Sequence, residues 1–166
     1  HKGFIMIQIE QEVWGLTPEG EGIIRYTMRN ESGAYVQLSN FGATILAAVV
    51  PDRNGKMEDV TIGFSNLEGY AKADPYFGAT IGRCGNRIAK GEYLMDGKVH
   101  KLQCHSPKRN PVCMVHGGID SFSHRVWKGE TFIDGDNAGI IFTLVSPDGD
   151  QLFPGTLNAT VKYTLT

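Results

Sequence analysis

The chain has 166 residues, the usual length of one globular domain. Hydrophobic residues make up 41% of it and charged residues 20%, a composition that excludes a disordered chain. Its 16 basic and 18 acidic side chains give a formal charge of −2, so the composition supplies no basic surface for a phosphate backbone. We therefore expect no nucleic-acid partner.

Neither a membrane span nor a disulfide framework is indicated. The most apolar stretch, residues 41–50, is half as long as the 20 or so residues that a spanning helix needs. Cys84, Cys104 and Cys113 are an odd number of cysteines without a CxxC pair, which predicts free thiols. No signal segment is visible, so we expect a cytoplasmic protein. The first residue is His1 rather than Met, which leaves a periplasmic or secreted origin open.

Short runs rich in β-branched and aromatic residues follow one another along the chain, which is typical of β-strands. In chain order the predicted strands are residues 5–13, 23–28, 34–38, 43–50, 58–62, 91–94, 98–102, 126–133, 139–145 and 156–165. Turn pairs that accept positive φ separate several of them: Asn54-Gly55, Asp96-Gly97, Asp134-Gly135 and Asp148-Gly149. One helical segment is predicted, residues 67–72, with Asn66 as its N-cap. Short turns between strands predict an all-β, antiparallel sandwich or barrel.

An arginine and asparagine cluster lies among small residues in the segment 82–91. The guanidinium group of Arg87 has five donors in a rigid plane, and the Asn86 amide adds donors and an acceptor. Together they could orient the hydroxyl groups of a neutral polyol. An alternative stays open, in which an arginine of this segment satisfies loop carbonyls or an exposed carboxylate.

His116 follows an apolar pair and precedes two glycines. An imidazole on such a loop can act as a general acid, a general base or a polar anchor. His105 and His124 lie among polar residues, on what we expect to be solvent-facing loops, and are weaker candidates.

Metal and nucleotide cofactors are both disfavoured. His100, Cys104, Cys113 and His116 are ligand types that zinc accepts. His100 and Cys104, however, lie about 13 Å apart if they share a strand, too far for one tetrahedral ion. No glycine-rich loop leads into a helix, so phosphate binding has little support. We expect neither a metal nor a cofactor.

Read in order, these motifs resemble the aldose 1-epimerase family of galactose mutarotases. The most specific pair is the Asn-Arg-Ile-Ala-Lys-Gly block at residues 86–91 followed by His-Gly-Gly at 116–118. Further matching stretches are residues 38–44, 50–56, 59–64, 66–70, 75–80, 82–83, Phe122, Trp127, 146–149 and 153–155. The likeness is collinear and covers nearly the whole chain.

This resemblance implies a galactose-mutarotase-like supersandwich, of which residues 1–166 would form a single β-sandwich lobe. It implies an isomerase that interconverts the α and β anomers of galactose or glucose without a metal or nucleotide. In such enzymes a glutamate takes the proton of the anomeric hydroxyl and a histidine protonates the ring oxygen. By resemblance, Asn86 and Arg87 bind sugar hydroxyls, and His116 contacts the substrate near its ring oxygen.

The departures from the family are equally informative. The family's second histidine, its substrate-binding aspartate and its catalytic glutamate have no counterpart in this sequence, which stops in a predicted strand. His116 is thus a contributor to an incomplete set, and we expect an N-terminal fragment that is inactive alone and self-associates through exposed strand edges. Extra residues at 107–115 lengthen the approach to His116. A noncatalytic carbohydrate-binding β-module and a purely structural β-domain are the alternatives.

Overall fold

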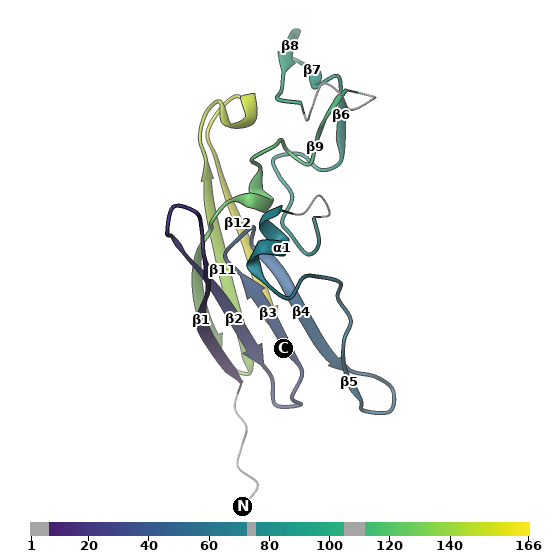
Figure 1. Ribbon diagram of the computed structural model, residues 1–166, viewed down its shortest axis with the longest axis vertical. Coiled ribbons are helices and arrows are strands. Elements are labelled where there is room, and N and C mark those ends of the chain that lie inside the picture. Colours follow the sequence, from purple (N-terminus) through teal and green to yellow (C-terminus); the bar gives the residue numbers. More distant parts are fainter. Residues whose placement is uncertain (1–6, 73–75, 105–111) are drawn as a thin grey trace, which may run out of the picture.

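A computed structural model of the chain describes residues 7–72, 76–104 and 112–166 (Figure 1). Its first half forms a five-stranded antiparallel sheet in which each strand pairs with the next along the chain. The strands are β1 (Gln8–Leu16), β2 (Gly22–Arg29), β3 (Tyr35–Ser39), β4 (Thr44–Pro51) and β5 (Met57–Asp59).

The second half forms a three-stranded antiparallel sheet and two small ribbons. The three strands are β10 (Lys128–Asp134), β11 (Asn137–Ser146) and β12 (Leu157–Leu165). Between the large sheets in sequence come β6 (Arg87–Ala89), β7 (Glu92–Met95), β8 (Lys98–Lys101) and β9 (Cys113–Val115). Strand β6 pairs with β9, and β7 with β8. Both ribbons lie at one end of the molecule, beyond the long strands (Figure 1).

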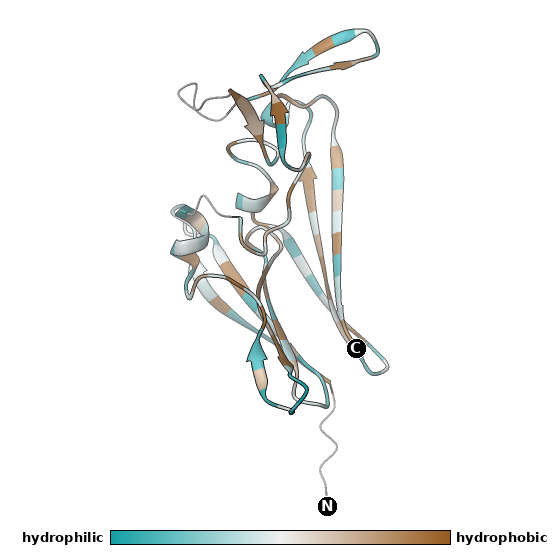
Figure 2. Ribbon diagram, turned by 90° about the vertical axis from the view of Figure 1, so that its right-hand side faces the viewer, coloured by the Kyte–Doolittle hydropathy of each residue, from teal (hydrophilic) through white to brown (hydrophobic). Residues whose placement is uncertain are grey.

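The two large sheets form the two layers of a sandwich, seen side by side in Figure 2. Alternate residues of β2 and β11 are buried between them, as the period of two in a strand requires. Tyr26 and Phe142 meet edge to face across the layers with ring centroids 5.7 Å apart. Trp127 is fully buried, and its indole N–H donates to the Phe122 carbonyl over 3.0 Å. The expected antiparallel β-sandwich is confirmed.

Most of the predicted turns and the single predicted helix are present. Asp96 and Gly97 have φ values of 52° and 73° in the tight turn between β7 and β8. Helix α1 (Leu67–Lys72) begins after Asn66, whose Oδ1 accepts a hydrogen bond from the Gly69 N–H over 3.0 Å. The Asp148-Gly149 pair instead leads into the short 3-10 helix η2 (Asp150–Leu152) before β12 begins.

The structure corrects two strand predictions and adds two strands that were not expected. The strand expected over residues 58–62 ends at Asp59, because the Asp59 carboxylate takes the N–H groups of Ala48 and Thr61 in place of ladder partners. Strands β6 and β9 were not predicted, since three residues are too few to show alternation. The strand expected over residues 5–13 is displaced to 8–16 and carries a bulge between Val13 and Gly15, while residues 5 and 6 lie outside the described part.

No helix in the described part of the chain is long and apolar enough to cross a membrane.

Candidate functional site

Pairing of β6 with β9 brings the three predicted site residues together. In this ribbon Arg87 lies opposite Val115, so Asn86 and His116 meet just beyond its end. The Asn86 N–H donates to His116 Nδ1 over 3.0 Å, and the His116 N–H donates to the Asn86 carbonyl over 2.9 Å. These reciprocal bonds join residues 30 positions apart in the sequence.

The bond to Nδ1 defines the tautomer of His116. Because Nδ1 accepts the Asn86 N–H, the ring proton of the neutral imidazole resides on Nε2. His116 is half-buried and therefore offers Nε2–H as a donor from a fixed ring. Such a donor suits a hydroxyl or ring oxygen.

The two arginines of the segment have different surroundings. Arg87 is exposed at the start of β6, and its Nη1 donates to Asn86 Oδ1 over 3.3 Å. Arg83 instead donates five hydrogen bonds to one hydroxyl and four carbonyl groups of residues 146–155. The alternative of an arginine that satisfies loop carbonyls therefore describes Arg83, whereas Arg87 lies beside the Asn86 amide.

The backbone at position 117, directly after His116, requires a glycine. Its φ is 90°, a value that L side chains rarely adopt. A Cβ atom at this position would lie 1.8 Å from the Gly82 carbonyl oxygen. The loop after His116 thus packs directly on the backbone that leads toward Asn86.

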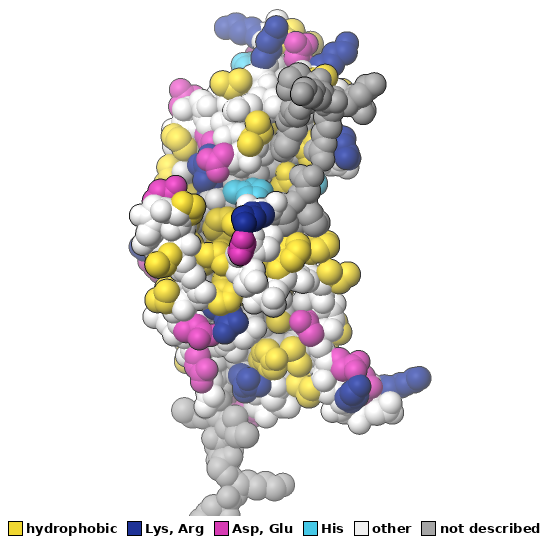
Figure 3. Space-filling model, viewed as in Figure 1, with side chains coloured by type: hydrophobic (Ala, Val, Ile, Leu, Met, Phe, Trp, Pro, Cys, Tyr) yellow, Lys and Arg dark blue, Asp and Glu magenta, His cyan; other side chains and the backbone are white. Residues whose placement is uncertain are grey.

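A row of aromatic rings lies beside His116. The Tyr76 ring meets His116 edge to face at 4.7 Å between centroids, and it meets His124 at 5.9 Å. His124 belongs to the 3-10 helix η1 (Phe122–His124), and its Nδ1 lies 3.0 Å from the Ser123 hydroxyl. Figure 3 shows histidine side chains at mid-height on this face, above a patch of hydrophobic ones.

The expectation that His124 faces solvent is wrong. It is half-buried, and this burial lowers its pKa below the usual histidine value, while the Asp120 charge acts weakly in the opposite direction. With Tyr76 it lines a small cavity of about 10 Å³, room for about one water molecule. His124 was only a weaker candidate and Tyr76 was not selected from the sequence, although the aromatic pair Tyr76-Phe77 before a glycine could have indicated a ring near the site. His105 lies outside the described residues.

The four residues of zinc-binding type are not assembled into one group among the described residues. Strand β8 ends at Lys101, so Cys104 is not on the strand with His100, and the His100 ring stacks on Tyr93 at 5.1 Å. Among residues 7–72, 76–104 and 112–166, no group of three or more His, Cys, Asp or Glu side chains is placed to hold a metal ion. The three cysteines are free thiols.

Comparison with known proteins shows the family of the chain. The family model for aldose 1-epimerase matches residues 25–166. Galactose mutarotase of Rattus norvegicus is 38% identical over 160 residues, which are 96% of this chain and 44% of the rat protein. Aldose 1-epimerase of Escherichia coli K12 is 38% identical over 155 residues, 93% of this chain and 43% of the bacterial protein.

Solved structures show the same fold. A crystal structure of galactose 1-epimerase from Lactobacillus acidophilus superimposes with a TM-score of 0.81 at 24% identity, over 96% of this chain and 45% of that one. An aldose epimerase homologue from C. elegans gives a TM-score of 0.69 at 26% identity. The chain thus spans less than half the length of these relatives. Since the family match takes in both halves of the sandwich and the β6–β9 ribbon, the chain belongs to the aldose 1-epimerase family.

Proposed function

We propose that residues 1–166 are the N-terminal, sugar-binding lobe of an enzyme that interconverts the α and β anomers of galactose- and glucose-type aldoses. The reciprocal hydrogen bonds between Asn86 and His116 carry this proposal, because they hold donors for sugar oxygens in one place. Arg87 and Asn86 bind sugar hydroxyls, and the Nε2–H of His116 is directed at the ring oxygen. The family membership and the closeness of these three residues support this assignment.

The reaction needs one base and one acid on either side of the sugar. The base removes the proton of the anomeric hydroxyl, the C1–O5 bond breaks as the aldehyde forms, and the acid protonates O5. Rotation about C1–C2 and ring closure on the other face give the second anomer. In this proposal His116 stabilises charge developing on O5, and the base and the second histidine come from the half of the relatives that this chain does not cover.

Sugar binding is tested by recording galactose-dependent amide chemical shifts in 15N-labelled protein. We expect saturable shifts at Asn86 and His116, which disappear in Arg87→Ala and in His116→Ala. Matched controls are Arg53→Ala, which removes an exposed arginine of the β4–β5 turn, and His100→Ala, on β8. Shifts that persist in both site variants would refute the proposed site.

A second prediction concerns turnover. The isolated chain should anomerise α-galactose no faster than buffer does, as followed by polarimetry, because its base belongs to the absent half. Turnover by the 166 residues that is lost in His116→Ala would show that the catalytic pair lies within this chain, contrary to the proposal.

The alternative is a noncatalytic carbohydrate-binding module on the same lobe, favoured by the donor-rich character of the Asn86, Arg87 and His116 group. Co-expression with the C-terminal half of the E. coli aldose 1-epimerase separates the two functions. Galactose binding with restored mutarotation supports the enzyme. A folded complex that binds galactose without turnover supports the module.

A further inference from the structure

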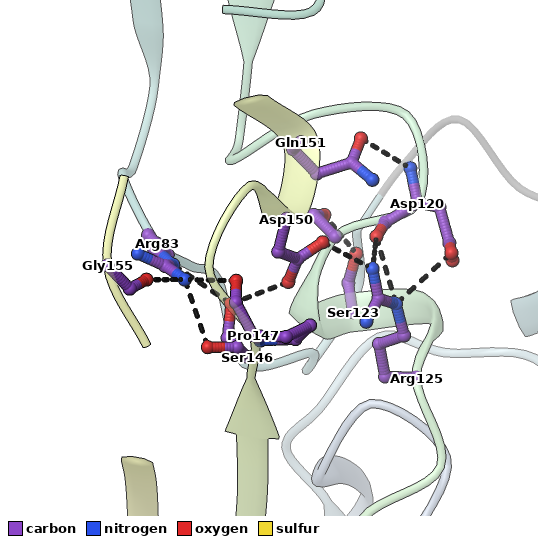
Figure 4. Close-up of polar contacts among 10 residues, drawn as sticks. Arg83, Asp120, Ser123, Arg125, Ser146, Pro147, Asp150, Gln151 and Gly155 are labelled. Atoms are coloured by element: carbon purple, nitrogen blue, oxygen red, sulfur yellow. Dashed lines mark hydrogen bonds and ion pairs between the residues drawn. The ribbon is translucent and has the colours of Figure 1, made fainter. Parts of the chain in front are cut away.

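Arg83 faces away from the proposed sugar site, although it lies only three residues before Asn86. Its guanidinium group reaches the loop of residues 147–155, here named the anchor loop, and Ser146 just before it (Figure 4). All its donor atoms are used. Nε donates to Ser146 Oγ over 2.9 Å, Nη1 to the Pro154 carbonyl over 3.0 Å, and Nη2 to the carbonyls of Ser146, Pro147 and Gly155 over 3.0, 2.9 and 2.7 Å.

The anchor loop also holds the segment that leaves His116. The Asp120 N–H donates to Gln151 Oε1 over 3.2 Å. Arg125 Nη2 donates to the Asp150 carboxylate over 2.6 Å, and Ser146 Oγ donates to the same carboxylate over 2.5 Å (Figure 4). The Asp150 side chain is only 7% exposed, so this ion pair is well shielded from solvent.

One loop of the second sheet therefore fixes the two segments that meet at the site. The segment before Asn86 is held through Arg83, and the segment after His116 is held through Asp120 and Arg125. The two segments also touch each other, because the backbone of Gly117 packs directly against the backbone of Gly82. A shift of either segment changes the distance from the Asn86 N–H to His116 Nδ1.

We propose that Arg83 is a positioning residue, which sets the tautomer of His116 by holding Asn86 in place. Its action on galactose rests on the proposed function, but its action on the imidazole does not, because the Asn86 to His116 bond forms without ligand. Lysine cannot replace it. An ammonium group has three donors at one point, whereas this site uses three nitrogens spread over a plane.

The test is the 15N spectrum of the histidine side chains in ligand-free protein. It is recorded at about pH 8.5, above the range in which histidines usually titrate. In the wild type His116 should show a protonated Nε2 and an unprotonated Nδ1. In Arg83→Lys the two nitrogen shifts should move toward each other as both tautomers become populated. The matched control, Arg53→Lys, should leave the wild-type pattern.

Backbone amide dispersion shows in the same samples whether each variant is folded. A folded Arg83→Lys with the wild-type tautomer would overturn the proposal. If Arg83→Lys does not fold, Ser146→Ala is compared with Asp150→Asn, because Ser146→Ala removes both the Nε partner of Arg83 and a hydrogen bond to Asp150, whereas Asp150→Asn leaves Arg83 all its partners. A larger change of tautomer in Ser146→Ala than in Asp150→Asn supports the proposal, and equal patterns refute it. Galactose affinity should fall about tenfold in folded Arg83→Lys. If the wild type binds no galactose but Arg83→Lys still changes the tautomer of His116, the proposed function is refuted and the role of Arg83 is supported.

Discussion

The roles of single side chains at this site cannot be predicted from residue type alone. Arg83 and Arg87 are four positions apart and chemically identical, yet one binds the backbone of a distant loop and the other is exposed beside Asn86. The residue pattern leaves both uses open for the arginines of this segment. It cannot assign them, since the partners of Arg83 lie 63 to 72 residues away.

Gly117 offers a test at the same scale. In Gly117→Ala the added methyl group would overlap the Gly82 carbonyl, so the backbone must move, and we expect a loss of about 2–4 kcal/mol in the free energy of unfolding. Gly20→Ala is the matched control. Its φ of 86° is nearly the same, but nothing lies within 4 Å, and it should cost about 1 kcal/mol. Urea unfolding followed by tryptophan fluorescence measures both, and equal losses would show that φ alone is responsible.

At the level of elements, the length of a strand decided whether it could be predicted from the sequence. The long strands β2, β4 and β11 are visible in the sequence as runs rich in β-branched and aromatic or other apolar residues, and β2 also shows a period of two. Strands β6 and β9 have three residues each, and β9 is buried throughout, which leaves no alternation to detect. The ribbon that assembles the site was therefore the part of the fold that periodicity could not reveal. Its residues were found from their side-chain chemistry and from the family's motifs instead.

The 3-10 helices show a second limit. His124 was expected on a solvent-facing loop among polar residues, but its neighbours Ser121 and Ser123 are buried, and their hydroxyls lie 3.3 Å apart. Polar residues can be buried where hydrogen bonds satisfy them, and those partners depend on the tertiary fold. One such partner is Trp127, whose indole N–H donates to the Phe122 carbonyl and ties this segment to the core.

For the whole molecule, the important contacts are those between the second sheet and the chain that precedes it. The sandwich core joins the sheets through apolar packing, while Arg125 and Asp150 join the anchor loop to the segment after His116. We propose that these residues form one lobe of a larger sandwich, in line with relatives of more than twice the length. The ion pair between Arg125 and Asp150 is the part of this assembly whose stabilising effect should depend on pH.

The pH response follows from Asp150. Burial by itself raises the pKa of this carboxyl group, but hydrogen bonds from Ser146 and Arg125 and the Arg125 charge outweigh it, so the folded-state pKa lies below the usual aspartate value. A lowered folded-state pKa means that the stabilisation is complete above the unfolded-state pKa and is lost as pH falls through the folded-state pKa.

Asp150→Asn should lower the free energy of unfolding by about 1–3 kcal/mol at pH 7 and by much less near pH 3. Urea titrations at the two pH values measure this, with the exposed Asp136→Asn as control. Half-buried His124 also destabilises the fold in acid, because its lowered pKa opposes protonation, but this contribution is common to wild type and variant and cancels in the difference. A penalty for Asp150→Asn that is the same at both pH values would show that the carboxylate charge contributes nothing to the link between the anchor loop and the site.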